Sequence, residues 1–546
     1  MSRRWAIFLG LAITVLGMFA LTLGCAAEVT PTRVPQVPAA SAAATAAPAA
    51  TAAPAEPAAP MVMRASAHFW SKNNPVDDHW GNHQHGMQWD RVFRWTDKGE
   101  TFNQLATKWE VVDGTNWRFH LRDDLTFWDG SPVTAHDFKF SLDEQLNRPG
   151  SARGILTPLK ITEVSVVDTY TVDIKMAQLN VQAGPRMIWV WVLPKDYIER
   201  VGWDGFLEEP MGSGPYKWSE WEAWDHTFAE KVDRTHPFRT VTLDKIEFFD
   251  VNITESAVAA LRTGALDLIS AYFEPEVVKD LDEDGFDVYV GGANKTSIRM
   301  HSMDACRLGR PACDKRVRQA FNLAVDRQSI SDNIWMGYAE PISQPGFPMR
   351  AGYNHDIIAE YNPAKAEALL DEAGFPRGAD GYRFEVTFMN WMAGTPHFMA
   401  LAMVDMWDKV GIKVAYEKVD ISVQLDYLFR RAGREPYDLA QYENAGTYPE
   451  NDPYTGQCND ATAKLCYFPY DNDKFYELQA QYQGEADPTK RAELVKQGLA
   501  ILVEDPYDVY ATTVPQFAIH HTKVKGFAYD SYQKLFWDDV WIDPDA

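Results

Sequence analysis

Positive charge is scarce in this chain of 546 residues. Lysine and arginine together number 52, against 77 aspartates and glutamates, and the formal net charge at pH 7 is −25. A surface of this sign repels nucleic acid and anionic lipid headgroups, so we expect no nucleic-acid partner. The length and a hydrophobic content of 46% instead predict a protein with two or more sizeable cores.

The sequence also lacks the short motifs of several enzyme classes. It contains no G-x-S-x-G nucleophile elbow, no H-E-x-x-H zinc helix and no glycine-rich phosphate or dinucleotide loop. A secreted glycoside hydrolase remains an alternative, because its two catalytic carboxylates need to be close in the folded structure and not in the sequence. A surface protein with a purely structural role is a further alternative. We predict a protein that is not an enzyme and has no cofactor.

The first 24 residues have the form of an export signal. Two arginines precede an apolar run from Trp5 to Gly24, and Cys25 follows. The segment Leu21-Thr22-Leu23-Gly24-Cys25 is similar to the lipobox of bacterial lipoproteins, although threonine stands where leucine is usual. We therefore expect lipidation at Cys25. A retained helix is the alternative, because about 20 apolar residues suffice to cross a bilayer.

Residues 26–60 have almost no large apolar side chains. They are rich in alanine, proline and threonine, as in AAATAAPAATAAPAEPAAP, and such a composition cannot build a core. Proline-rich chain is extended, at about 3 Å per residue. We interpret residues 25–62 as a tether between the lipid anchor and a globular body that begins at Met63.

Cysteine is rare, and four of the five cysteines fall into two close pairs. These are Cys306 with Cys313 and Cys458 with Cys466. Pairs this close would each close a small loop in an oxidising compartment, and we expect two disulfides. A zinc site is the alternative, but neither pair has the C-x2-C spacing of structural zinc.

Strand and helix patterns alternate along the body, which predicts an α/β fold. The expected strands are 117–122, 170–176, 244–251, 384–390 and 413–419. The expected helices, with apolar residues three and four positions apart, are Lys315 to Asn333, Pro363 to Glu372, His397 to Val410 and Pro488 to Val503. Asn362 has the position of a capping residue, with proline in the first turn after it and Gly374 at the far end.

Several blocks of the body carry distinctive motifs in a fixed order. They are WEVVDGTNWRFHLRDDLTFWDGSPVTAHDFKFSL at 109–142, GSGPYK at 212–217, AVAALRTGALDLIS at 257–270, CDKRVRQA at 313–320 with NLAVDR at 322–327, NPAKAEALLDEAGFP at 362–376, VGIKV at 410–414 and the segment 505–527. In this order they resemble extracellular solute-binding protein family 5, the dipeptide- and oligopeptide-binding components of ABC importers. The resemblance covers nearly all of residues 63–546.

The resemblance implies a periplasmic-binding-protein-like type II fold, with two large lobes joined by a hinge and an inserted third subdomain. The first lobe would comprise 63–303 and 511–546, with the insertion at about 100–210, and the second lobe would comprise 304–510. A solute would bind between the lobes and close them. The implied partners are a small-molecule solute and the permease subunits of an importer, and we expect a monomeric, extracytoplasmic, membrane-anchored lipoprotein.

In peptide-binding relatives an acidic side chain pairs with the amine of the solute, within the segment that here reads QYENAGTYPENDP at 441–453. Glu443, Glu450 and Asp452 are the candidates, and Glu443 is preferred. Dipeptide binders also place an arginine after the strand that matches 384–390, but here the chain continues Asn390-Trp391-Met392-Ala393-Gly394. The missing cation favours an oligosaccharide over a short peptide, because a buried carboxylate without a partner is unfavourable.

Aromatic side chains are abundant enough to line a sugar site, with 19 tryptophans in the chain. Their faces pack on sugar rings while their edges hydrogen-bond to hydroxyls. We predict that some of the aromatic candidates contact the solute and that others lie in the core. The predicted solute contacts are Trp80, Trp89, Tyr272, Phe273, Asn390, Trp391, Tyr442, Glu443, Asn444, Tyr448 and Asp452.

Histidines cluster near the start of the body, at His79, His83 and His85, with His68 upstream. Their spacing is compatible with a transition metal such as nickel or zinc. Histidines on a polar loop are more often exposed or hydrogen-bonded without a metal. We therefore predict no resident metal and keep a nickel or metal-chelate importer component as an alternative function.

Overall fold

The structure is a computed structural model. It describes residues 60–66, 74–76, 82–95, 101–148, 156–181, 183–222, 225–251, 254–271, 273–300, 302–344, 352–357, 360–424, 437–444, 457–458, 468–529 and 535–545. The chain divides into two compact units, Met1–Ala58 and Ala59–Ala546. All of the described residues belong to the second unit.

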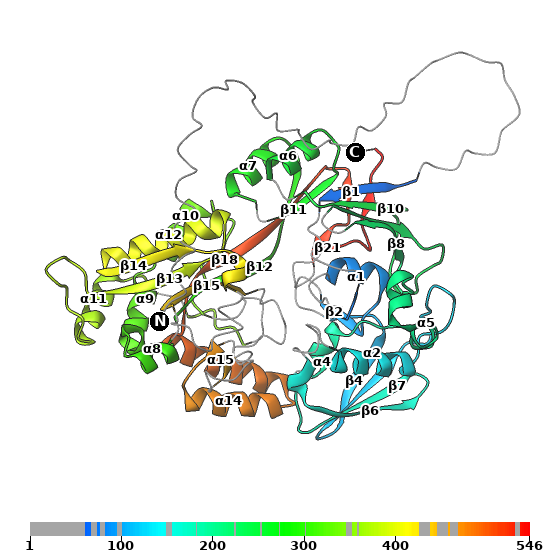
Figure 1. The fold of residues 1–546 in the computed structure, drawn as a ribbon, viewed down its shortest axis with the longest axis horizontal. Helices are drawn as coiled ribbons and strands as arrows, with labels where there is room; N and C mark the ends of the chain where they lie inside the picture. Colours follow the sequence, from blue (N-terminus) through cyan, green and yellow to red (C-terminus); the bar gives the residue numbers. More distant parts are fainter. Residues whose placement is uncertain are drawn as a thin grey trace, which may run out of the picture. The chain divides into compact units, whose positions relative to one another are not determined.

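A ten-stranded mixed sheet runs through this unit (Figure 1). Its strands, in spatial order, are β14 (Ile412–Lys418), β13 (Phe384–Asn390), β15 (Leu439–Asn444), β12 (Asp287–Met300), β18 (Asp508–His520), β11 (Leu268–Ala271), β1 (Val62–Ser66), β10 (Lys245–Phe249), β9 (His226–Lys231) and β8 (Tyr216–Glu222). The predicted α/β body is therefore present, and strands predicted at 244–251, 384–390 and 413–419 are confirmed to within four residues at each end.

The two longest strands, β12 and β18, pair antiparallel at the centre of the sheet (Figure 1). Almost every residue of β18 is buried, as expected for a strand covered on both faces. Their register shifts twice, between Gly291 and Asn294 and between Lys295 and Ser297. Such bulges bend a strand pair locally.

The cores on either side of this strand pair draw on different parts of the chain. One side has two apolar clusters, which combine residues between Met63 and Leu281 with residues between Phe517 and Val540. On the other side, a cluster runs from Ile298 to Val514 and includes helices α9 (Lys315–Leu323) and α12 (Gly394–Lys409). The two clusters on the first side form the first core region, and the cluster from Ile298 to Val514 forms the second core region.

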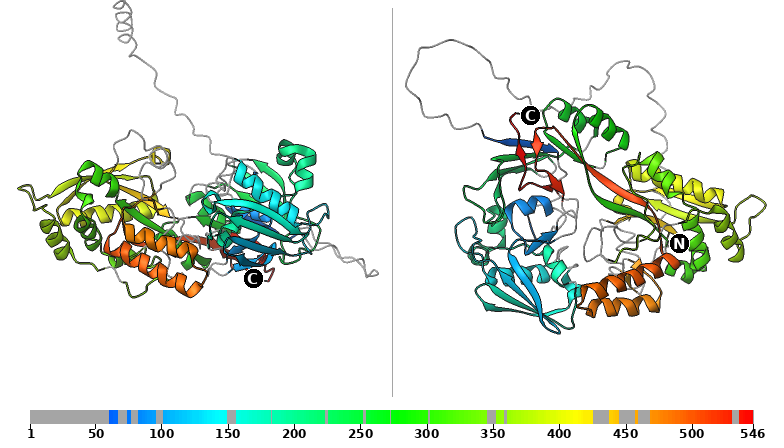
Figure 2. Two further views of the ribbon diagram at one scale, coloured as in Figure 1. Left: turned by 90° about the horizontal axis from the view of Figure 1, so that it is seen from below. Right: turned by 180° about the vertical axis from the view of Figure 1, so that it is seen from behind.

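A separate four-stranded antiparallel sheet has the order β4 (Ala106–Asp113), β5 (Asn116–Leu121), β7 (Thr171–Met176) and β6 (Ile161–Asp168). Helix α2 (Ala135–Asn147) packs against β6 and β7 (Figures 1 and 2). Its N-terminus has a capping box between Thr134 and Asp137. The sheet and helix enclose their own core, whose buried members lie between Val92 and Val192, with Met211 and Phe238 packed against it.

The other helices flank the sheets. They are α1 (Asn82–Gln88), α4 (Ala183–Arg186), α5 (Lys195–Glu208), α6 (Thr254–Arg262), α7 (Pro275–Glu283), α8 (Ser302–Leu308), α10 (Arg327–Ile334), α11 (Pro363–Glu372), α14 (Asp473–Gly484) and α15 (Pro488–Glu504), with short 3-10 turns at Thr157–Leu159, Met187–Trp189 and Pro311–Cys313. Short strand pairs join β2 (Phe93–Trp95) to β3 (Thr101–Asn103), β16 (Gln457–Cys458) to β17 (Phe468–Pro469), β19 (Val524–Lys525) to β22 (Trp541–Ile542), and β20 (Ala528–Tyr529) to β21 (Leu535–Phe536).

One predicted helix is two helices. The pattern from Lys315 to Asn333 predicts a single element, but α9 ends at Leu323 and α10 begins at Arg327. Asp326 has extended backbone angles, and its carboxylate accepts a hydrogen bond from the Ser329 amide at 3.0 Å. An aspartate in this role starts a new helix, whereas the apolar spacing continues across the break and conceals it.

A buried charge cluster joins three distant segments beside the first core region. Asp90 follows α1, Arg239 precedes β10, and Asp538 lies near the end of the chain. Arg239 contacts Asp538 at 2.5 Å and Asp90 at 3.2 Å, and all three side chains are at most 5% exposed. Burial alone would raise the pKa of Asp90, but His236 and Arg239 outweigh it and hold that pKa well below its usual value.

The segment Gly212-Ser213-Gly214 packs directly against the end of α1. The Gly214 amide donates to the Gln88 carbonyl at 2.8 Å, and a methyl group on Gly214 would lie 2.2 Å from the Met87 carbonyl oxygen. The Ser213 hydroxyl donates to Asp90 at 2.8 Å. This segment therefore has a packing role that only glycine satisfies.

Within the described residues, no helix has both the length and the apolar character needed to cross a membrane.

Candidate functional site

The carboxyl ends of three parallel strands meet at one edge of the second core region. Strands β13 and β14 pair in parallel along their full length, and the last pair in register is Asn390 with Lys418. Strand β15 pairs in parallel with the other side of β13. In open α/β sheets, ligands bind outside the carboxyl ends of strands, where neighbouring connections leave in opposite directions. We call the ends of β13, β14 and β15 the carboxyl edge.

Five of the predicted solute contacts lie at the ends of β13 and β15. Asn390 ends β13, and Trp391 follows it. Tyr442, Glu443 and Asn444 are on β15 beyond its last pairing with β13, and their backbones pair with β12 instead. The side chains of these three β15 residues lie outside what the structure describes, so their part in binding stays a prediction.

Side-chain hydrogen bonds hold the turn after β13. Asn390 is fully buried: its amide donates to the Tyr416 hydroxyl at 2.9 Å, and its carbonyl oxygen accepts from the Met392 amide at 2.7 Å. The Tyr416 hydroxyl in turn meets His397 Nδ1 at 2.7 Å. Asn390 thus positions the turn, while Trp391 is half-buried and keeps a surface at the edge.

Lys418 brings a cation to the same edge. Its ammonium donates to the Trp391 carbonyl, and the side chain is otherwise exposed. Partial desolvation lowers the pKa of Lys418, and nearby Asp420 offsets part of this effect. Burial also lowers the pKa of His397, and the charge of Lys418 lowers it further, which favours the neutral imidazole. Residues 390–394 carry no cation, as the sequence shows, but Lys418 at the end of the neighbouring strand β14 lies beside Trp391.

Glu274, from the other side of the strand pair, lies near the start of α12. A methyl group on Gly394, the first residue of α12, would lie 3.4 Å from the Glu274 carboxylate. Glu274 precedes α7, which packs in the first core region. A contact is shown elsewhere: Val181 packs in the apolar cluster of α14 and α15, and its amide donates to the Gln483 carbonyl at 3.2 Å.

Two of the predicted solute contacts are core residues. Trp89 has no exposed surface; it packs against Phe206, and its indole Nε1 donates to the Met211 carbonyl at 3.0 Å. Phe273 is 2% exposed and belongs to the apolar cluster around α6 and α7. Neither has a face to offer a solute, because their apolar surfaces are already used in packing.

Four further candidates, Trp80, Tyr272, Tyr448 and Asp452, lie outside the described residues, as does Cys25. Cys306 and Cys313 are joined by a disulfide, with their Cα atoms 4.4 Å apart. Cys458 is on β16, but its side chain and Cys466 are outside the description, so the second disulfide stays a prediction.

The histidine cluster has one described side chain. His85 is fully buried among tryptophans, with ring centroids 5.6 Å from Trp89, 5.9 Å from Trp191 and 6.2 Å from Trp218. This is a packing role. In the part of the chain that the structure describes, no three His, Cys, Asp or Glu side chains are grouped so as to hold a metal ion.

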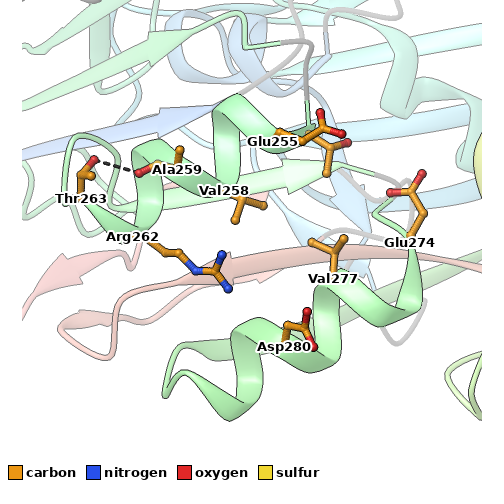
Figure 3. A pocket seen from close by; sticks show the side chains of 9 residues that line it. Glu255, Val258, Ala259, Arg262, Thr263, Glu274, Val277 and Asp280 are labelled. Atoms are coloured by element: carbon orange, nitrogen blue, oxygen red, sulfur yellow. Dashed lines mark hydrogen bonds between the residues drawn. The ribbon is translucent and has the colours of Figure 1, made fainter.

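A surface groove of about 680 Å³ lies between α6 and α7 (Figure 3). Figure 3 shows Val258 and Arg262 from α6, with Val277 from α7 across the groove. Arg262 is bound to Asp284 at 2.5 Å. No residue named above as a predicted solute contact lines it, and Glu274 is one of its lining residues.

Comparisons with known proteins bear on this architecture. Residues 100–465 match the family described as bacterial extracellular solute-binding proteins, family 5 Middle. The chain belongs to this family. The match covers more than half of the chain. The fold of this protein is the type II periplasmic-binding-protein fold that the sequence predicts.

Two curated relatives are similar to this chain over most of its length. Heme-binding protein A of Haemophilus influenzae is 26% identical over 469 residues, which are 78% of this chain and 82% of the relative. The dipeptide-binding protein of Escherichia coli is 23% identical over 485 residues, 81% of this chain and 86% of the relative. The solved structure of a periplasmic binding protein, DppA from Helicobacter pylori in complex with the peptide STSA, has a TM-score of 0.72 and 22% identity, covering 88% of this chain and 98% of that one.

Proposed function

We propose that this protein is the solute-binding component of an ABC importer for peptides and delivers its solute to permease subunits in the membrane. Family membership and the name of the dipeptide-binding relative support this proposal. The observation that supports it in the structure is the carboxyl edge, where the Lys418 ammonium donates to the Trp391 carbonyl and where β15, the strand that carries Glu443, pairs with β13.

The charges at the edge suit a peptide. A peptide is a zwitterion, and Glu443 lies on the strand that passes the end of β13, while Lys418 ends the strand on the other side. An acid for the amine and a base for the carboxylate would each form a charge-assisted hydrogen bond. An oligosaccharide is the second candidate, since the half-buried Trp391 offers an aromatic face to a sugar ring.

Solute binding should be detectable as an increase in melting temperature of the full chain. A ligand that binds only the folded state stabilises it, by about 2.7 kcal/mol when present at 100 times its dissociation constant. We expect di- to pentapeptides to raise the melting temperature in a thermal-shift screen. Oligosaccharides, hemin and nickel or zinc salts are the comparison ligands.

The outcomes of this screen separate the candidates. A shift with peptides alone supports the proposal. A shift with oligosaccharides alone would replace the peptide by a sugar. A shift with hemin or metal alone would assign a different cargo, and no shift with any ligand would contradict a peptide-binding role.

We also propose that Cys25 carries a lipid and anchors the protein outside the cytoplasm. The support is the export-signal pattern of residues 1–24 and the extracellular character of the family. In a bacterial host fed radiolabelled palmitate, the wild-type chain should take up label and Cys25→Ser should not. Equal labelling of the two proteins would contradict the anchor. A Cys306→Ser/Cys313→Ser variant is the control and should be labelled like the wild type.

A further inference from the structure

We propose that Val181 is a latch, which joins the four-stranded sheet to helices α14 and α15 in the closed protein and thereby sets the affinity for the solute. The inference rests on the proposed solute-binding function and gives the four-stranded sheet a part in it. Val181 is not one of the predicted solute contacts, so the latch acts on the closure of the lobes and not on the solute itself.

Val181 does not pack in the core of the sheet that carries it. It follows β7 and precedes α4, and residues on either side of it use that core: Leu179 packs against it, and Ala183 is one of its buried members. Val181 is only 7% exposed, yet it belongs to the cluster of α14 and α15. Among the described residues, the other buried members of that cluster lie between Tyr470 and Tyr507. The valine is therefore buried by a distant part of the chain.

The backbone of the same residue caps a helix. The last four carbonyls of an α-helix have no partner within the helix, and Gln483 is the second-last residue of α14. Its carbonyl accepts a hydrogen bond from the Val181 amide at 3.2 Å. Figure 1 shows α4, which begins just after Val181, beside α14. Apolar burial and a helix cap thus act together at one contact.

The two partners in this contact are fastened to different core regions. In the four-stranded sheet's core, the Val192 amide donates to the Asp90 carbonyl at 3.0 Å, and Asp90 is part of the buried charge cluster beside the first core region. On the other side, the Gln319 side chain of α9 donates to the Glu504 carbonyl, at the end of α15, at 2.7 Å. Helix α9 belongs to the second core region. The Val181 contact therefore links the two regions at a place other than the β12–β18 pair.

A contact in this place can bias the closure of the lobes. Lobes joined by a hinge move about the segments that cross between them, which here are β12 and β18. Opening there would separate α14 from the four-stranded sheet, expose Val181 to water and take away the amide that caps the Gln483 carbonyl. The latch therefore favours the closed form. A solute that binds the closed form gains apparent affinity as the population of that form rises.

The test replaces Val181 with aspartate in the full chain. A carboxylate there would lose its water on burial and would face the partial negative charge at the C-terminus of α14, so the closed form is disfavoured. Isothermal calorimetry with Ser-Thr-Ser-Ala and with trialanine measures the affinity. We expect Val181→Asp to bind about 10-fold more weakly than the wild type, or weaker still, as the closed population falls. Val181→Ile keeps an apolar side chain and should bind like the wild type.

The matched control is Val167→Asp. Val167 is on β6 of the same sheet and is 48% exposed, so the same change of side chain should leave binding unaltered there. Small-angle X-ray scattering of the solute-free proteins gives a readout that needs no ligand. Val181→Asp should have a larger radius of gyration than the wild type and Val167→Asp. Val181→Ser removes the apolar contact without adding a charge; it should show smaller changes in the same direction and replaces the aspartate variant if that variant does not fold.

The two readouts decide the inference together. Weaker peptide binding with a larger radius of gyration supports the latch, whereas a change in only one of the two, or in neither, would overturn it. A general loss of stability would instead lower the melting temperature without enlarging the folded protein. If neither peptide binds the wild type, the proposed peptide function is contradicted, and the radius of gyration of the solute-free proteins still decides whether Val181 holds the lobes together.

Discussion

Replacing Arg239 with methionine should lower the free energy of unfolding by about 3–5 kcal/mol, because it leaves two buried carboxylates without their shared cation. Asp90 and Asp538 are both fully or almost fully buried beside Arg239, and Arg94 remains as a partner of Asp538 alone, at 2.9 Å. Methionine fills a similar volume, so the loss reflects charge more than packing. Urea unfolding followed by circular dichroism and by tryptophan fluorescence measures the effect.

The matched control for this variant is Arg262→Met. Arg262 also binds an aspartate, Asp284 at 2.5 Å, but both side chains are about half exposed. Exposed ion pairs typically contribute about 0–1 kcal/mol, so this variant should unfold at nearly the same urea concentration as the wild type. Equal destabilisation by the two variants would show that the buried cluster is not the stabilising feature proposed here.

The pH dependence of the cluster has a definite sign. The pKa values of Asp90 and Asp538 are both held below their usual range, because the attraction of nearby cations exceeds the effect of burial. A depressed carboxyl pKa gives stability that is complete above the unfolded pKa of about 4 and is lost as the pH falls below it. The stability difference between the wild type and Arg239→Met should therefore shrink in acid.

The local structure could be predicted from the sequence to a large extent, and the sheet could not. Helix α11 follows its expected bounds because Asn362 caps it, accepting a bond from the Lys365 amide at 3.0 Å, and Gly374 ends it with a φ of 88°. These signals are local in the sequence. In contrast, β1 pairs with β10, with Val62 in register with Lys245. No pattern within either strand predicts a partner so far away in the sequence.

The candidate site was predicted only in part, for two physical reasons. Trp89 and Phe273 were expected among the solute contacts, but an aromatic residue suits a core and a binding surface equally well, and burial depends on tertiary packing. Lys418 was missed because the search for a cation followed the chain beyond Asn390. In a parallel sheet, the last residues of neighbouring strands lie at the same edge. The end of the strand predicted at 413–419 was therefore the signal that could have indicated Lys418.

Replacing Gly214 with alanine should destabilise the protein by about 3 kcal/mol or more, because the added methyl group meets backbone that cannot move aside. It would lie 2.2 Å from the Met87 carbonyl oxygen. Moving the segment away would break the bond from the Gly214 amide to Gln88 and the bond from the Trp128 indole to the Gly214 carbonyl, both 2.8 Å long. The midpoint of urea unfolding measures the change.

Gly114→Ala is the control, because a methyl group at Gly114 meets nothing within 4 Å, and a small effect is expected there. If Gly214→Ala is as stable as Gly114→Ala, the close approach to α1 is not a real constraint. The expected contrast would explain the GSGPY block in physical terms. Its glycines let the chain between 212 and 214 lie against the backbone of α1, while Ser213 bonds to Asp90 in the buried cluster. The motif therefore supports the packing of this segment against α1 and the buried charge cluster.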